Sequence, residues 1–296
     1  MDRPVPAWSS QFALEVLPVV ERAGLTDTMT WEEAIGESGG EGVKVAVIDS
    51  GIDATHPVLH DSIQGYAAFQ KTDEGILTIT EPHSDECGHA TACAGIIRSL
   101  APECQLYSVK VLGKGAIGLG AIFIEGLRWA VANGMHVCNM SLGTTRKEFF
   151  AELHEVADLA YFQQVILVTA ANNIPIPSFP SMYASVISVA AHEEQDPYRF
   201  YYNPHPPVEF GAPGIDIRVP WPGGQWIRGT GNSFAAPHMT GIVAKLLGKH
   251  PGLTPFQVKT ILRALAANTA QSGPLSSQRE GTSQSDRSQK YGEVSL

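Results

Sequence analysis

The feature that most constrains the fold is a regular alternation of short apolar runs with longer amphipathic runs. Short apolar runs are typical of buried strands, and amphipathic runs are typical of helices. The strand-like runs cover residues 43–48, 106–112, 137–143, 165–172 and 186–190, and the helix-like runs cover 122–133, 148–161, 239–247 and 255–267. Strands that alternate with helices form a mostly parallel sheet with helices on both faces. The sequence therefore predicts a three-layer, doubly wound α/β fold.

Length and composition favour one large domain with an appendage at each end. The chain has 296 residues, of which 44% are hydrophobic, so it can bury a substantial core. We predict an N-terminal extension over residues 1–40 and a main domain over 41–268. The extension contains weakly helical pieces at 12–23 and 30–35. Residues 269–296 are rich in Ser and Gln and predict a disordered polar tail.

Charge and cysteine usage limit the partners and the compartment. A formal net charge of -10 argues against nucleic acid and anionic membrane surfaces as partners. No apolar run is long enough to span a bilayer, and the N-terminus lacks the basic start and apolar core of a signal peptide. We therefore expect a cytoplasmic protein with reduced thiols, the alternative being one disulfide. The cysteines, which show no metal-ligand spacing, are Cys87, Cys93, Cys104 and Cys138.

One small-residue turn delivers a serine to the start of a predicted helix. Ser233 follows Gly229 and Gly231 and precedes the helix-like run 239–247. Free N–H groups and the dipole at a helix N-terminus favour developing negative charge. Taken alone, such a turn is more typical of helix capping. Ser233 is a candidate nucleophile only if a base and an orienting acid lie elsewhere in the chain.

Two other polar residues stand at the ends of predicted elements. Asp49 follows the strand-like run 43–48, and functional groups of α/β proteins gather at the carboxyl ends of central strands. The structural alternative for Asp49 is a simple turn aspartate. His89 is followed by small residues at helical spacing, which predicts that it lies near the start of a closely packed helix.

The order Asp49, His89, Ser233 resembles the acid, base and nucleophile of the subtilisin-like serine proteases. The likeness extends over about residues 25–268 and rests on three stretches, Val45–Asp53, Gly88–Gly95 and Gly231–His238. The sequence departs from the family pattern at three positions, where the family usually has glycine, a second histidine and threonine. These positions are Ala90, Ala92 and Asn232.

The resemblance implies a serine endopeptidase that acts through a Ser233 acyl-enzyme. His89 would accept the serine proton and pass it to the leaving amine, and Asp49 would hold the imidazole tautomer. Peptides or proteins would be the substrates, with no cofactor, and the enzyme would process a particular peptide precursor. Two alternatives are a peptide ligase or macrocyclase that uses the same acyl-enzyme, and an inactive peptide-binding module with a degenerate site.

The resemblance also implies donors for the tetrahedral oxyanion. The backbone N–H of Ser233 is one, and Asn172 is the expected second, with Asn173 as the alternative if the register shifts by one residue. Asn232 would either donate a further hydrogen bond to the oxyanion or cap the following helix.

Two segments are expected to pair with an extended substrate as added strands. Their residues are Gly115, Ile117, Gly118, Ser141, Leu142 and Gly143. The run 173–179 would close the primary specificity pocket and contains no acidic residue, so no strong preference for Arg or Lys at the cleavage site is expected. By the same resemblance, Val58 replaces a calcium-ligating aspartate, and we expect no calcium at that site and no metal in the active centre.

Overall fold

The structure is a computed structural model that describes residues 29–116, 118–205 and 207–269. A nine-stranded sheet with the order β3-β2-β4-β1-β5-β6-β7-β9-β8 runs through it, and β10 and β11 form a separate hairpin. The strands are β1 Lys44–Asp49, β2 Ile63–Thr72, β3 Gly75–Ile79, β4 Gln105–Lys110, β5 Val137–Met140, β6 Ile166–Ala170, β7 Ile187–His192, β8 Tyr201–Tyr202, β9 Phe210–Pro213, β10 Ile217–Trp221 and β11 Gln225–Gly229. The α-helices are α1 Trp31–Ala34, α2 His89–Leu100, α3 Gly120–Ala132, α4 Phe150–Phe162, α5 Asn232–Lys249 and α6 Pro255–Leu265.

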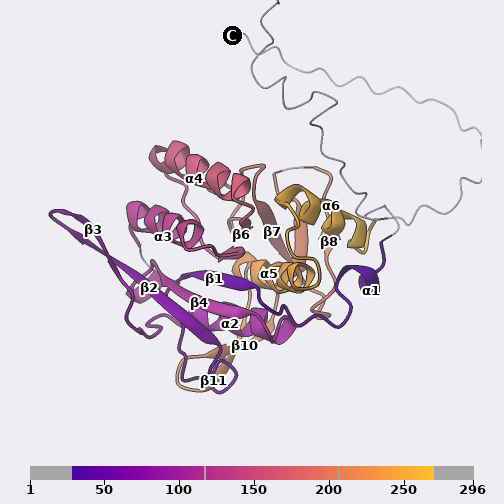
Figure 1. The fold of residues 1–296 in the computed structure, drawn as a ribbon, viewed down its shortest axis with the longest axis horizontal. Coiled ribbons are helices and arrows are strands. Elements are labelled where there is room, and N and C mark those ends of the chain that lie inside the picture. Colours follow the sequence, from indigo (N-terminus) through magenta and orange to yellow (C-terminus); the bar gives the residue numbers. More distant parts are fainter. Residues whose placement is uncertain (1–28, 117, 206, 270–296) are drawn as a thin grey trace, which may run out of the picture.

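The sheet is parallel from β2 to β9, and the edge strands β3 and β8 pair antiparallel with their neighbours. Helices cover both of its faces (Figure 1): α3 and α4 lie on one side, and α2 and the β10–β11 hairpin lie on the other. The predicted three-layer α/β architecture is therefore confirmed. All parallel strands end at one edge of the sheet, which is where loops of such folds build their sites.

Side chains of the central strand β1 alternate between two separate cores. Val45 and Val47 pack with α2 and α5, whereas Ala46 and Ile48 pack with α3 and α4. All four are fully buried, which explains why these consecutive positions are all apolar and do not alternate with polar residues. The last residue of the strand, Asp49, follows this alternation onto the α2 and α5 side.

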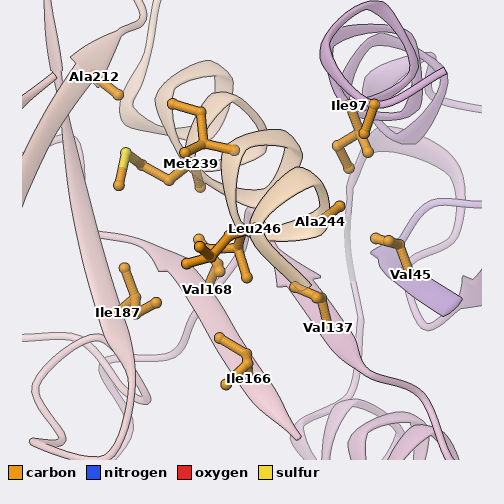
Figure 2. Packing of buried hydrophobic residues seen from close by; sticks show 14 of the residues in the cluster. Val45, Ile97, Val137, Ile166, Val168, Ile187, Ala212, Met239, Ala244 and Leu246 are labelled. Atoms are coloured by element: carbon orange, nitrogen blue, oxygen red, sulfur yellow. The ribbon is translucent and has the colours of Figure 1, made fainter. Parts of the chain in front are cut away.

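The helix α5 occupies the centre of the larger core. Its residues from Phe234 to Leu247 are all buried, so it has no solvent-facing stripe. Figure 2 shows Met239, Ala244 and Leu246 of this helix surrounded by side chains from the strands and from α2. The small residues of α5 allow this close approach, and its N-terminal turn lies at the site edge of the sheet.

Part of the segment predicted as an N-terminal extension packs against the main domain. Thr30 caps α1 with a capping box that Glu33 completes, and Ala34 and Ile35 are buried in the main core. Gly39 and Gly40 are buried as well, so the segment ahead of β1 is packed against the domain from residue 34 onward. The helical piece expected at 12–23 and the tail expected beyond residue 269 lie outside the described residues.

Three antiparallel pairings escaped the sequence prediction because their strands are short or polar. They are β2 with β3, β8 with β9, and β10 with β11. The β2–β3 hairpin projects from one end of the sheet (Figure 1). Among the helices described, none has the length and hydropathy that crossing a bilayer requires.

The contact between α2 and β10 gives a stability prediction at Gly95. Alanine normally stabilises a helix interior by about 1 kcal/mol relative to glycine. A Cβ on Gly95, however, would lie 2.1 Å from Cγ and 2.6 Å from Cδ of Pro220, whose ring has no flexible end. We expect Gly95→Ala to lower the free energy of unfolding by about 1 kcal/mol net, because overpacking costs about 1–3 kcal/mol.

Urea unfolding measures this change, with Gly95→Ala/Pro220→Ala as the control that removes the obstructing ring. The double variant should lose less stability than the sum of the two single variants. A rise in stability for Gly95→Ala alone would contradict the packing argument.

Candidate active site

The proposed acid and base are joined directly. The Nδ1 atom of His89 lies 2.8 Å from Oδ2 of Asp49, whose side chain is fully buried, while 21% of the His89 side chain is exposed. His89 is the first residue of α2, and Asp49 is the last residue of β1. The hydrogen bond fixes the imidazole so that Nδ1 carries the proton and Nε2 is left to act as a base.

The environment of His89 raises its pKa above the ordinary value. The largest cause is the negative charge of Asp49. Burial acts in the opposite direction, and the hydrogen bond to Asp49 and the charge of Asp85 add to the rise. The resemblance to the subtilisin-like serine proteases implies that this histidine and this aspartate meet, and the structure brings them together.

Ser233 stands in the first turn of the buried helix α5. Its carbonyl oxygen receives no helical N–H bond, because the residue four positions later is Pro237. The Ser141 hydroxyl donates to that oxygen at 2.8 Å, and the Cys93 thiol donates to it at 3.6 Å. Cys93 lies one turn after His89 on α2, so the serine turn and the histidine helix are in direct contact.

No hydrogen bond joins the Ser233 hydroxyl to His89 within the described residues. The ring of the next residue, Phe234, has its centroid 5.7 Å from that of His89. In ligand-free enzymes the bond between nucleophile and base is often long and tightens when substrate binds. The acid–base contact is thus formed, and the turn that carries Ser233 lies against the helix that carries His89.

The two asparagines after β6 take different positions. The Oδ1 atom of Asn172 accepts a hydrogen bond from the Ile174 N–H at 3.0 Å, which turns this side chain along its own loop. The Oδ1 atom of Asn173 accepts from the Asn232 N–H at 2.8 Å, in the serine turn. A Cβ placed on Gly231 would lie 3.2 Å from Oγ of Ser233 and 3.6 Å from Nδ2 of Asn173.

The hydroxyl of Ser233 and the amide of Asn173 therefore flank one small space. Asn172 and Asn173 both line the cavity beside Ser233, so the expectation that Asn172 is the oxyanion donor, with Asn173 as the alternative, stays a prediction. Because β6 stops at Ala170, the side-chain directions of the next residues depend on the turn.

Asn232 fills neither of the two roles considered for it. Its Oδ1 accepts from the Ala191 N–H at 2.8 Å, and its Nδ2 donates to the carbonyl oxygens of Ala171 and Asn172 at 3.2 and 3.0 Å. The helix is instead capped at Gly231 without a side-chain bond. Asn232 ties the serine turn to the ends of β6 and β7 and so helps to place the two asparagines.

A cavity of about 160 Å³ opens beside Ser233. It is lined by Ser141, Leu142, Gly143, Ala170, Ala171, Asn172, Asn173, Ser178 and Ser233. Its volume suits one side chain, since drug-sized ligands occupy about 300–1,000 Å³. The described residues around it carry no charge, and the hydroxyls of Ser178 and Ser181 lie 2.9 Å apart at one wall. Of the run 173–179, Asn173 and Ser178 line this cavity.

A second cavity, of about 390 Å³, joins the two expected substrate segments. Gly118 lines it from one side, and Leu142 and Gly143 line it from the other. Gly115 lies in the 3-10 turn Lys114–Ala116 with φ 77° and lines neither cavity, and Ile117 lies outside the described residues. Five of the six expected positions are thus placed, and four of them border the two cavities.

One group of side chains at this site has the composition of a metal centre. The ligand atoms of Asp49, His89 and Cys93 all lie within 4.8 Å of one another. A metal-binding cysteine is deprotonated, but burial raises the pKa of the Cys93 thiol well above its ordinary range. The Nδ1 atom of His89 is already hydrogen-bonded to Asp49. The same atoms therefore fit an acid–base pair better than a cation site.

Comparison with known proteins agrees with this geometry. Residues 40–292 match the family model described as the subtilase family, so the chain belongs to the subtilase family. Subtilisin E of Bacillus subtilis is 35% identical over 242 residues, which cover 77% of this chain and 61% of that protein. Subtilisin of Bacillus pumilus is also 35% identical over 242 residues, with 77% of this chain and 84% of that protein covered.

Solved structures show the same fold. The S41 psychrophilic protease matches with a TM-score of 0.65 and 26% identity, and sphericase matches with a TM-score of 0.65 and 25% identity. Each match covers 76% of this chain and 83% of the other. The chain spans 61% of the length of the first two curated relatives, subtilisins E and NAT.

The raised pKa of His89 predicts two opposite pH trends. Because its pKa is higher in the folded protein than the ordinary value of about 6.5, the protonated ring stabilises the fold fully below that pH. This contribution is lost as the pH rises through the folded pKa. The neutral ring that a general base requires becomes populated over the same interval.

An NMR titration of the His89 ring measures this pKa in the wild type and in Asp49→Asn. We expect the pKa to fall in the variant, since the charge of Asp49 is the largest cause of the rise. Equal values in the two proteins would show that Asp49 does not control the imidazole.

Proposed function

We propose that this subtilase is a serine endopeptidase with Asp49, His89 and Ser233 as its catalytic residues. The observation that carries the proposal is the 2.8 Å bond between the buried Asp49 carboxylate and Nδ1 of His89, on a helix that contacts the Ser233 turn. Peptides or proteins are the substrates. The family membership supports this reaction, and the relatives named above are called subtilisins or proteases.

The geometry supports a two-step acyl transfer. Oγ of Ser233 attacks the substrate carbonyl carbon while Nε2 of His89 takes its proton, and Asp49 stabilises the imidazolium that forms. His89 then gives this proton to the leaving amine, and the acyl-enzyme remains on Ser233. A water molecule, deprotonated by the same imidazole, releases the acid product.

The oxyanion of each tetrahedral intermediate lies between two donors. One is the Ser233 N–H at the N-terminus of α5, where the helix dipole favours negative charge. The other is Nδ2 of Asn173, on the far side of the space next to Gly231. Electrostatic stabilisation of this kind is usually the largest single contribution to catalysis.

The two cavities indicate how a substrate chain is held. The uncharged 160 Å³ cavity accepts the side chain next to the cleaved bond, and the segments around Gly118 and Leu142 pair with the chain before it. This arrangement suits a neutral side chain at the cleavage position. We propose hydrolysis of a particular peptide precursor in the cytoplasm, and product masses distinguish this from ligation, because hydrolysis adds water.

Labelling with a fluorophosphonate probe tests the proposed nucleophile. We expect the wild-type protein to be labelled and Ser233→Ala to remain unlabelled, because only an activated hydroxyl attacks the phosphorus. Circular dichroism confirms that both proteins are folded. Equal labelling of the two folded proteins, or none of either, would overturn the proposal.

Asn173 and Asn172 form a matched pair for testing the oxyanion donor. We expect Asn173→Ala to lower kcat by about 10²–10³ with little change in KM, since one oxyanion donor contributes that much. Asn172→Ala, which removes only the bond to the Ile174 N–H, should change kcat far less. Steady-state kinetics on a neutral chromogenic peptide measure both. The reverse order of effects would assign the role to Asn172.

A further inference from the structure

We propose that Asp85 is a positioning residue that locks the start of α2 onto the Asp49 loop and thereby fixes the imidazole of His89. The inference rests on the proposed function, and it concerns a carboxylate that does not touch the reacting atoms. Asp85 lies in the loop between β3 and α2, four residues before His89, and only 8% of it is exposed.

Asp85 takes the place of the N-cap side chain that α2 lacks. The N-cap residue of α2 is Gly88, at φ 91°, and a Cβ there would lie 2.3 Å from Cε2 of Trp221. No capping side chain can therefore stand at position 88. Asp85 acts from three residues earlier, and its carboxylate accepts the N–H groups of Gly88 at 2.7 Å and of Thr91 at 3.0 Å.

The same carboxylate is connected to the catalytic acid through one residue. The Ser50 hydroxyl donates to Oδ1 of Asp85 at 2.9 Å, and the Ser50 N–H donates to Oδ1 of Asp49 at 2.7 Å. The Ser50 hydroxyl also accepts the N–H of Ala90 at 3.2 Å. The 2.8 Å bond from His89 to Asp49 closes a ring of contacts. The distance between β1 and the first turn of α2 is thus set by Asp85.

The Asp85 carboxylate is surrounded by hydrogen-bond donors. It accepts five hydrogen bonds in all, which include those from the Thr91 hydroxyl at 2.7 Å and the Cys87 N–H at 2.9 Å. A carboxylate has only acceptor sites and suits such a set. The titratable groups that act on or lie against the His89 ring are Asp49 on β1, Asp85 in the loop and Cys93 on α2. Asp85 adds to Asp49 in raising the pKa of His89.

The chain provides a matched control in Asp53. It is also 8% exposed and also accepts several hydrogen bonds, from the N–H and hydroxyl of Thr55 and from the Gly223 N–H. The Gly223 bond holds the turn of the β10–β11 hairpin, and the Thr55 bonds are local. The Asp53 contact with the first turn of α2 is made by its backbone N–H to the Thr91 hydroxyl at 3.0 Å and is retained in Asp53→Asn. Asp53→Asn therefore removes a comparable buried carboxylate without changing the charges that act on His89.

The experiment compares Asp85→Asn with Asp53→Asn by thermal unfolding, by steady-state kinetics over a pH series and by NMR titration of His89. Both variants should unfold at lower temperature. Only Asp85→Asn should lower kcat, by about 10- to 100-fold as for a small misplacement of a catalytic group, with KM within about twofold. Its acidic limb of kcat/KM and its His89 pKa should both move to lower pH, because a nearby negative charge is lost.

Ser50→Ala provides a second test. It removes the hydroxyl through which Ser50 connects Asp85 to Asp49, and it leaves the charge of Asp85 in place. We expect kcat to fall while the His89 pKa stays nearer the wild-type value. Wild-type kcat and an unmoved acidic limb in Asp85→Asn would overturn the inference. The same changes in Asp53→Asn would also overturn it, because they would reflect general loosening.

Failure of the proposed function has a different signature. A wild-type protein that is neither labelled by the fluorophosphonate nor active would contradict catalysis by Ser233. The NMR titration still tests in that case whether Asp85 acts on the His89 ring, since the His89 pKa should fall in Asp85→Asn and not in Asp53→Asn. An unchanged His89 pKa in Asp85→Asn would overturn the inference without any turnover.

Discussion

The site depends on a carboxylate that has no contact with water. Asp49 is fully buried, and an isolated buried charge is too costly to persist in a folded protein. It is stabilised by two hydrogen bonds, from the N–H of Ser50 and from the imidazole of His89. The bond from His89 forms only when α2 is in place against β1. The topology of the parallel sheet therefore determines the chemistry, because it delivers the end of β1 and the start of α2 to the same edge.

The proposed nucleophile, Ser233, is positioned by a different kind of constraint. Pro237 leaves the carbonyl of Ser233 without its helical donor, and that carbonyl is satisfied by Ser141 after β5 and by Cys93 on α2. An interruption of one helix thus becomes a connection between three elements. Asn232 makes the equivalent connection to the ends of β6 and β7. Each of these contacts joins a side chain to a backbone N–H or carbonyl group, and none involves a charged surface residue.

The sequence predicted the layers and the acid–base–nucleophile order because both are written in strong local patterns. The positions of β1 that are buried on both sides of the sheet, Val45 to Ile48, are all apolar, and the observed strand limits differ from the expected ones by at most three residues. The β2–β3 hairpin was missed, since only Ala67 and Phe69 of its two strands are buried. Asn172 and Asn173 could not be distinguished from the sequence, because a turn of unknown geometry sets where each side chain points. The role of Asp85 also left no local signal, as it caps a helix from outside the usual cap position.

The burial of α5 has a consequence for how the molecule moves. Its residues from Phe234 to Leu247 are all buried, so no partial opening can expose its backbone amides without dismantling the main core. Hydrogen exchange from this helix should accordingly be governed by global unfolding, while the loops that border the cavities exchange by local fluctuations. Ser233 thus lies between a helix expected to exchange its amide hydrogens slowly and loops expected to exchange them fast.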